Sequence, residues 1–290
     1  FERINKTAYE KRCILEANRI GVQGHRAAQQ AFSRAESEFE IQHAYLAATA
    51  QREQENPYAA IVAINANSAV LHYQHYETSR LPQQHLHSML IDAGAQYNGY
   101  AADITRCHAF RPGLYRDLIQ ALDSEQLELI AAIECGLPFL DLHKQMQLRL
   151  ATLLREFKLT DLQPEDMLAE NLTFTFMPHG LGHYLGLQTH DVGGYLQDRR
   201  GTLQQPPEAH PTLRITRNIE DDQVFTIEPG IYFIPSLLNG LRESEHAGAF
   251  NWDRIESLLP CGGIRIEDNI CIDAGNVHNL TRTCFQELDS

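Results

Sequence analysis

The sequence predicts an α+β domain in which helices and β-hairpins alternate around one antiparallel sheet. Apolar residues recur at three- and four-residue spacing over residues 7–32, which is the periodicity of an amphipathic helix. Short apolar runs bounded by turn residues, typical of hairpin strands, occupy residues 88–110 and return in the last third of the chain. No stretch of the 290 residues is biased enough to be a domain linker, so we expect one domain over residues 1–290.

The first third is expected to hold two helices followed by two short strands. After the helix at residues 7–32, Ser37 and Glu40 have the spacing of a capping box and predict the start of a second helix. Residues 61–64 and 69–73 form short apolar runs, which predict two strands joined by an asparagine-rich turn.

The middle of the chain predicts a hairpin followed by two long helices. Apolar runs within residues 88–110 flank the dipeptide Asn98-Gly99, which strongly favours a tight hairpin turn. Residues 114–134 and 141–157 then show the apolar spacing of amphipathic helices.

Strands separated by long loops are expected in the last third. Residues 197–212 are polar and contain three prolines, and residues 239–251 are expected to form a second loop. Glu228 and Glu267 each follow an apolar, strand-like run that ends in isoleucine, so each carboxylate should face away from that isoleucine. Each glutamate alone also fits the alternative of a solvated strand end.

Composition excludes several classes of function. The formal charge of −14 argues against nucleic-acid binding, because such a surface repels phosphate groups. No apolar run approaches the roughly 18 to 20 residues that span a bilayer. The six cysteines form no CxxC pair, so we expect reduced thiols in the cytoplasm and no thiolate-held zinc.

Asp92 and Asp103 lie in the two arms of the predicted hairpin. They are directly opposite if the turn centres between Tyr97 and Asn98, and diagonal neighbours if it centres on Asn98-Gly99. Both registers put the two carboxylates on one face, where they would repel each other unless a cation lay between them. The alternative is that each aspartate caps a turn.

Two histidines accompany the glycines of the segment Met177-Pro178-His179-Gly180-Leu181-Gly182-His183, and a third, His190, follows seven residues later. Glycine lets the backbone approach a ligand closely, and neutral imidazole is a common nitrogen ligand for metals. The glycines disfavour a helix and no glutamate follows His179, so an HExxH zinc site is excluded.

Taken together, the four acids predict a site for two divalent ions. Asp92, Asp103, Glu228 and Glu267 contribute about −4, which two divalent ions would balance. Oxygen ligands with one imidazole suit Mn²⁺, although the general order of affinities favours Zn²⁺.

Four segments of the sequence resemble motifs of the pita-bread-fold metallopeptidases: LIDAGAQYNGYAADITR, FMPHGLGHYLGLQTHDVGG, VFTIEPGIYF and GGIRIEDNI. The sequences of these motifs are similar to those of the bacterial Xaa-Pro dipeptidases, or prolidases, including relatives with organophosphorus acid anhydrolase activity. The resemblance runs from about Asn5 to the C-terminus. It implies a pita-bread (creatinase/aminopeptidase-like) fold, with a curved antiparallel sheet covered by helices. It also implies a cytoplasmic homodimer that uses a metal-bridging hydroxide to cut Xaa-Pro dipeptides before proline.

The resemblance assigns a ligand role to five residues. Asp92 would bind one metal ion, and Asp103 and Glu267 would bridge both ions. His183 and Glu228 would complete the second ion's coordination. Manganese is the metal that we expect for this pair of ions.

Further catalytic roles are expected for five residues. Glu228 would carry the proton of the nucleophile to the leaving nitrogen, and His179 and His190 would stabilise the oxyanion or the substrate carbonyl. His72 would line the proline subsite. Arg265 would either hold the product carboxylate or brace nearby acids.

Rival readings share the fold and differ in chemistry. They are an organophosphorus triester hydrolase, an Xaa-Pro or methionine aminopeptidase, a creatinase-like hydrolase and a non-catalytic binding protein. The N-terminal domain of the family is expected to be absent from this chain, which bears on dipeptide selectivity and dimer geometry. Cys107-His108 also departs from the family's usual threonine and aromatic residue, with no consequence that the sequence assigns.

Overall fold

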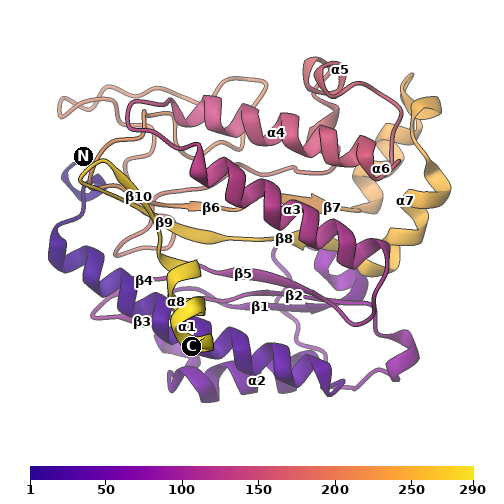
Figure 1. Cartoon of the computed structure of the whole chain (residues 1–290), viewed down its shortest axis with the longest axis horizontal. Coiled ribbons are helices and arrows are strands. Elements are labelled where there is room, and N and C mark those ends of the chain that lie inside the picture. Colours follow the sequence, from indigo (N-terminus) through magenta and orange to yellow (C-terminus); the bar gives the residue numbers. More distant parts are fainter.

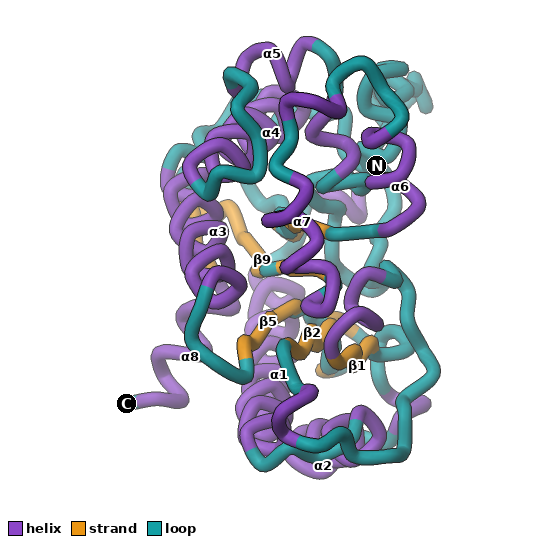
Figure 2. Tube along the Cα trace, turned by 90° about the vertical axis from the view of Figure 1, so that its right-hand side faces the viewer, coloured by secondary structure: helices purple, strands orange, loops and turns teal.

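The strands lie in the middle of the molecule, between two layers of helices (Figure 1, Figure 2). One layer contains α3 (Leu114–Ala131) and α4 (Phe139–Glu156), and the other contains α1 (Ala8–Ser33) and α2 (Glu38–Thr49). The structure is a computed structural model that describes residues 1–290. Its helices are α1 (Ala8–Ser33), α2 (Glu38–Thr49), α3 (Leu114–Ala131), α4 (Phe139–Glu156), α5 (Pro164–Ala169), α6 (Pro235–Arg242), α7 (Trp252–Leu258) and α8 (Leu280–Asp289). Its strands are β1 (Ile61–Ile64), β2 (Ser88–Asp92), β3 (Gln96–Tyr97), β4 (Tyr100–Ala101), β5 (Thr105–Ala109), β6 (Val224–Ile227), β7 (Gly230–Tyr232), β8 (Gly263–Arg265), β9 (Asp268–Asp273) and β10 (Asn276–Asn279).

Capping boxes start the first two helices. The Ser37 side chain accepts from the Glu40 amide, and the Glu40 carboxylate accepts from the Ser37 amide, as the sequence predicted for α2. Thr7 and Glu10 form the same reciprocal pair at the start of α1. Both helices therefore begin at a side chain that satisfies free amide groups of their first turn.

The predicted hairpin forms around Asn98-Gly99. Both residues have positive φ, 50° and 83°, as a type I′ turn requires. Strand β2 pairs with β5 so that Asp92 lies opposite Thr105, which makes Asp92 and Asp103 diagonal neighbours. Of the two registers that the sequence allowed, the structure therefore contains the one centred on Asn98-Gly99.

The second half of the chain adds the strand order β10-β9-β6 to the first-half order β1-β2-β5. A β-bridge between Thr105 and Glu267 joins the two groups of strands, and the Glu267 amide donates to the Thr105 carbonyl at 3.1 Å. Every strand pair is antiparallel. The helices α3 and α4 pack on the second group of strands, where Phe139 meets Phe225 edge to face at 5.6 Å. The predicted α+β class and helix-covered antiparallel sheet are confirmed.

Two predicted elements are wrong. Residues 69–73 are not a strand: a 3₁₀ turn, Asn65–Ala69, is followed by irregular chain, because polar groups of this segment bond to the buried Glu38 side chain. Part of the predicted loop 239–251 belongs to α6, which begins with Pro235 at its first position.

None of the helices is both long enough and apolar enough to cross a membrane.

Candidate active site

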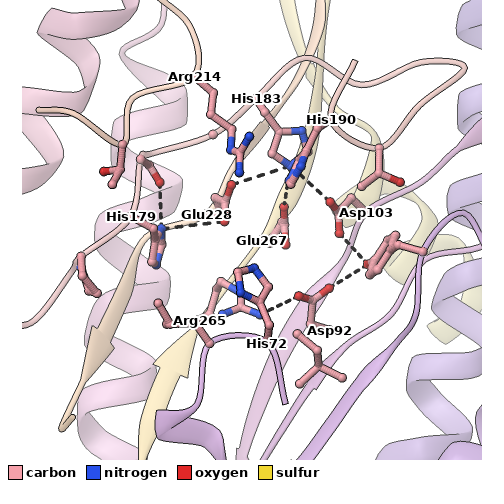
Figure 3. Close-up of a pocket in the computed structure, with 18 of the residues that line it drawn as sticks. His72, Asp92, Asp103, His179, His183, His190, Arg214, Glu228, Arg265 and Glu267 are labelled. Atoms are coloured by element: carbon pink, nitrogen blue, oxygen red, sulfur yellow. Dashed lines mark hydrogen bonds and ion pairs between the residues drawn. The ribbon is translucent and has the colours of Figure 1, made fainter. Parts of the chain in front are cut away.

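One cavity of about 580 Å³ collects every residue that the sequence singled out for chemistry (Figure 3). Five of these residues are the expected metal ligands, and the others are the expected histidines and arginine. The nine residues are His72, Asp92, Asp103, His179, His183, His190, Glu228, Arg265 and Glu267.

The acids reach this cavity from the ends of strands. Asp92 is the last residue of β2, Glu228 follows β6, and Glu267 lies between β8 and β9. Asp103 stands just before β5. Because the two groups of strands join at the Thr105–Glu267 bridge, carboxylates that are far apart in the sequence share one site.

Glycines allow the histidine segment to lie against β6. A Cβ atom on Gly182 would stand 1.9 Å from the Thr226 carbonyl oxygen, and one on Gly180 would stand 2.7 Å from that of Thr212. No side chain fits at such distances, so this close approach requires glycine. The Thr226 amide donates to the His183 carbonyl at 2.9 Å, and the segment is not helical, as expected from its glycines.

His183 presents one ring nitrogen to the carboxylates. Its Nδ1 donates to the Tyr184 carbonyl at 3.0 Å, which fixes the tautomer and the ring orientation. Its Nε2 lies 3.2 Å from Asp103, 3.6 Å from Glu267 and 3.7 Å from Glu228. A neutral imidazole in this orientation offers a lone pair to the space that the carboxylates enclose.

The carboxylates are crowded and buried. Burial and the charge of Glu267 raise the pKa of Asp103 to about 7, and the same two causes raise the pKa of Glu228 well above its usual range. Burial acts to lower the pKa of His183, yet the adjacent carboxylates raise that pKa well above its ordinary value. The site therefore has an excess of negative charge that favours any bound cation or proton.

A divalent cation fits this donor set. Ligand atoms of Asp103, His183 and Glu267 all lie within 4.8 Å of one another. The Oε2 atom of Glu267 accepts from the Thr105 hydroxyl at 2.7 Å, whereas its Oε1 atom is buried with no hydrogen-bond partner. Such an oxygen is costly unless something binds it, and oxygen donors with one imidazole suit a divalent ion.

Asp92 is held by two neighbours on its two oxygens. The Tyr58 hydroxyl lies 2.7 Å from its Oδ1 and 2.5 Å from Asp103 Oδ1, so one hydroxyl hydrogen serves two carboxylates. Arg265 donates to Asp92 Oδ2 at 2.6 Å, and its other nitrogens donate to Tyr232 at 2.6 Å and to Thr105 at 3.3 Å. Each of the three nitrogens of this guanidinium thus donates to a group within the protein.

The three non-ligand histidines differ in their partners. His179 Nδ1 lies 2.8 Å from the Gly180 carbonyl and its Nε2 lies 3.1 Å from the Tyr232 hydroxyl. His190 packs edge to face on His183 at 4.3 Å between ring centroids, and His72 enters from the side of Asp92 and Arg265 (Figure 3). Burial lowers the pKa of His179 to about 4 and that of His190 to about 3. Both rings are therefore neutral at physiological pH.

Sequence reasoning missed several residues of the cavity. Tyr58 and Arg214 line it, and Tyr232 and Thr105 brace Arg265 and Glu267. Thr105 and Tyr232 lie inside the quoted motifs, so their proximity to the acids was a usable signal. Tyr58 and Arg214 lie in segments without such a pattern.

The sequence profile of metallopeptidase family M24 matches residues 12–274, which is most of the chain. This chain belongs to metallopeptidase family M24. An M24 relative from Aeromonas hydrophila, described as an Xaa-Pro dipeptidase, is 52% identical over 282 residues, covering 97% of this chain and 64% of the relative. The Xaa-Pro dipeptidase of Pseudoalteromonas translucida is 50% identical with the same coverage, 97% and 64%. The chain thus spans less than two thirds of the length of these relatives.

Solved structures show the same M24 fold. Zinc-substituted Escherichia coli aminopeptidase P in complex with product superposes with a TM-score of 0.77 at 25% identity, over 98% of this chain and 57% of that one. Proline aminopeptidase P II from Yersinia pestis gives a TM-score of 0.75 at 26% identity, over 98% and 58%. The pita-bread fold that the sequence motifs implied is confirmed, together with membership of a metallopeptidase family.

Proposed function

We propose that residues 1–290 are the catalytic domain of a metal-dependent Xaa-Pro dipeptidase. The observation that carries the proposal is the buried group Asp103, His183 and Glu267, in which one Glu267 oxygen has no partner. The names of the M24 relatives at about half identity supply the substrate class.

Five residues are proposed to hold two divalent ions. Asp103 and Glu267 would bridge the ions, Asp92 would bind one, and His183 and Glu228 would bind the other. Four carboxylates around one imidazole balance the charge of two such ions, and this oxygen-rich set favours manganese as the metal. The two ions would activate water and polarise the scissile carbonyl.

Glu228 is proposed to move the proton of the attacking water. Glu228 lines the cavity beside the other proposed ligands, and a carboxylate in this position can accept the proton and then deliver it to the leaving nitrogen. It stands between His183, at 3.7 Å, and His179, at 3.9 Å.

His190 is proposed as the donor to the oxyanion. Its ring has no hydrogen-bond partner within the protein and points into the cavity, so an N–H group is free for substrate (Figure 3). The Nδ1 N–H of His179 donates to the Gly180 carbonyl, and its Nε2 accepts from the Tyr232 hydroxyl, so its expected role as a second donor requires that the N–H leaves Gly180 on substrate binding. His72 would line the proline subsite beside these groups.

Arg265 is proposed as a brace, the second of the two roles that the sequence left open. Its guanidinium is committed to Asp92, Tyr232 and Thr105. Arg214 also lines the cavity and makes no hydrogen bond or ion pair within the protein, so it is better placed to receive the substrate carboxylate.

A cytoplasmic location and a homodimer complete the proposal. All six cysteines are free thiols, which supports a reducing compartment. The homodimer rests on the sequence resemblance.

The test of function is hydrolysis of Ala-Pro by chelator-stripped protein, with and without added Mn²⁺. We expect turnover only with metal, and no comparable turnover of Ala-Ala. Metal-dependent cleavage of a phosphotriester without cleavage of Ala-Pro would overturn the proposal in favour of the organophosphate alternative.

A further inference from the structure

Glu38 is a buried carboxylate without a counter-ion, on the first turn of α2. Its residue is 1% exposed, and no lysine, arginine or histidine forms an ion pair with it. A buried charge of this kind is costly unless hydrogen bonds and dipoles satisfy it. The start of a helix supplies a favourable dipole, and the remaining stabilisation comes from one segment of chain.

Four groups donate hydrogen bonds to the Glu38 carboxylate. Its Oε1 accepts from the Ile64 amide at 2.7 Å and from the Asn67 side chain at 2.8 Å. Its Oε2 accepts from the Tyr73 hydroxyl and from the Glu77 amide, both at 2.8 Å. These donors lie at both ends and in the middle of residues 64–77, so one carboxylate fixes the course of that segment.

The same segment carries part of the active-site wall. Leu71, His72 and Gln74 line the cavity, and His72 directly precedes the buried Tyr73. The segment has no regular strand or helix after Ala69 that could hold it. The His72 ring makes no hydrogen bond within the protein, so its place beside Asp92 and Arg265 depends on the backbone (Figure 3).

We propose that Glu38 is a positioning residue that sets His72 in the active site through its hydrogen bonds to residues 64–77. The proposal rests on the proposed dipeptidase function for its kinetic readout, but the contacts that carry it are independent of the metal ligands. Glu38 does not touch the substrate: it acts on catalysis only through His72 and the adjoining wall.

The variant Glu38→Gln removes this role with little change in size. Each carboxylate oxygen accepts one backbone N–H group, from Ile64 or from Glu77. Whichever way the glutamine amide turns, its NH₂ group therefore meets a backbone donor, and one end of the segment is released. Glu40→Gln is the matched control, because Glu40 lies on the same helix turn and glutamine keeps an oxygen that can accept from the Ser37 amide in the capping box. Only the surface ion pair with Arg80 is lost.

For Ala-Pro hydrolysis we expect kcat/KM to fall about 10- to 100-fold in Glu38→Gln, which is the loss of rate that displacement of a catalytic group typically causes. In Glu40→Gln we expect kcat/KM to fall less than about 3-fold. In a His72→Ala background, Glu38→Gln should cost less than about a further 3-fold, because the two changes act on one group. Additive losses would overturn the proposal and leave Glu38 a purely structural residue. Unchanged kcat/KM in Glu38→Gln would overturn it as well.

A second readout does not depend on turnover. In the metal-free protein with isotope-labelled histidine, the His72 imidazole signal, assigned with His72→Ala, should shift in Glu38→Gln and stay in place in Glu40→Gln. Hydrogen exchange of residues 64–77 should quicken in the same variant. An unmoved His72 signal would overturn the proposal even if the enzyme is active, whereas an inactive wild type with a shifted signal would overturn only the dipeptidase assignment.

Tyr73→Phe keeps the test decisive if Glu38→Gln does not fold. It removes one of the four donors and leaves both backbone contacts in place. We expect the His72 signal to shift in the same direction as in Glu38→Gln, by a smaller amount. The loss of kcat/KM in Tyr73→Phe should likewise not add to the loss in His72→Ala. A folded Tyr73→Phe protein with an unmoved signal would contradict the proposal.

Discussion

Arg265 donates from Nη2 to Asp92 Oδ2 at 2.6 Å, and both side chains are largely buried, with 6% and 13% exposure. The guanidinium also holds Tyr232 and Thr105, so it connects three elements around the proposed metal centre. The planar fork of arginine makes these contacts at once, and a lysine ammonium cannot reproduce them.

We therefore predict that Arg265→Lys weakens Mn²⁺ binding or turnover by about 10- to 100-fold, the usual effect of losing a group that orients a metal ligand. Calorimetric titration with Mn²⁺ and kcat/KM for Ala-Pro measure the two effects. Wild-type values for both quantities would show that Asp92 needs no brace. Arg242→Lys is the control, because Arg242 forms an exposed ion pair with Glu256.

His190 is predicted to act on substrate and not on metal. His190→Ala should lower kcat by about 100-fold or more, the typical loss of one oxyanion donor, with bound Mn²⁺ unchanged. Metal content measured by atomic absorption, beside steady-state kinetics, separates the two properties. Loss of metal in this variant would make His190 a ligand and would contradict its assigned role.

We predict that the buried His143 makes stability depend on pH, independently of the metal site. It is 3% exposed on α4, packs against the His210 ring at 4.8 Å, and has no partner for its Nδ1. Burial lowers its pKa to about 3, below that of an unfolded histidine. Between about pH 6.5 and 3 the unfolded chain therefore binds a proton that the folded chain does not, so stability falls as pH falls, by up to about 1.4 kcal/mol per pH unit.

The variant His143→Phe should flatten this part of the stability curve. Urea unfolding at several pH values between 4 and 7 measures it, with the exposed His43→Phe as control. Equal pH slopes in wild type and His143→Phe would show that His143 is not a source of the acid sensitivity.

Lys6 and Asp191 form an ion pair behind the loop that carries His190, and we predict that this pair stabilises the fold. Both side chains are 1% exposed and their charged atoms are 3.2 Å apart, with Arg3 as a further partner of the aspartate. Lys6→Met leaves a buried carboxylate with one cation fewer, which typically costs about 3 kcal/mol or more. Lys6→Met/Asp191→Asn should recover much of the loss.

Chemical unfolding of the two variants and of Lys11→Met checks this prediction. Lys11 pairs with the exposed Asp222 and Asp273, so its loss should cost at most about 1 kcal/mol. A smaller loss of unfolding free energy in Lys6→Met than in Lys11→Met would contradict the prediction.

Local signals were enough for much of the fold. The Ser37 and Glu40 pair fixed the start of α2, and Asn98-Gly99 fixed a hairpin that brings Asp92 and Asp103 to one face. Both signals act over a few residues, so neighbouring side chains decide the outcome.

Long-range contacts decided what the sequence did not predict. Residues 69–73 have a strand-like composition, yet their course is set by Glu38, more than thirty residues earlier. Likewise, Tyr58 joins the two aspartates only because distant strand ends converge there, and no local pattern marks it. The role of Arg265 stayed open for the same reason, because its three partners come from separate elements.

Calorimetric titration of the metal-free protein with Mn²⁺ tests the central claim, a two-metal centre, most directly. We predict that the wild type binds two equivalents of Mn²⁺ and that Asp103→Asn and Glu267→Gln each lose at least one. Circular dichroism should show that both variants keep the fold. Absence of binding in the wild type, or unchanged binding in both folded variants, would contradict a two-metal centre built on these carboxylates.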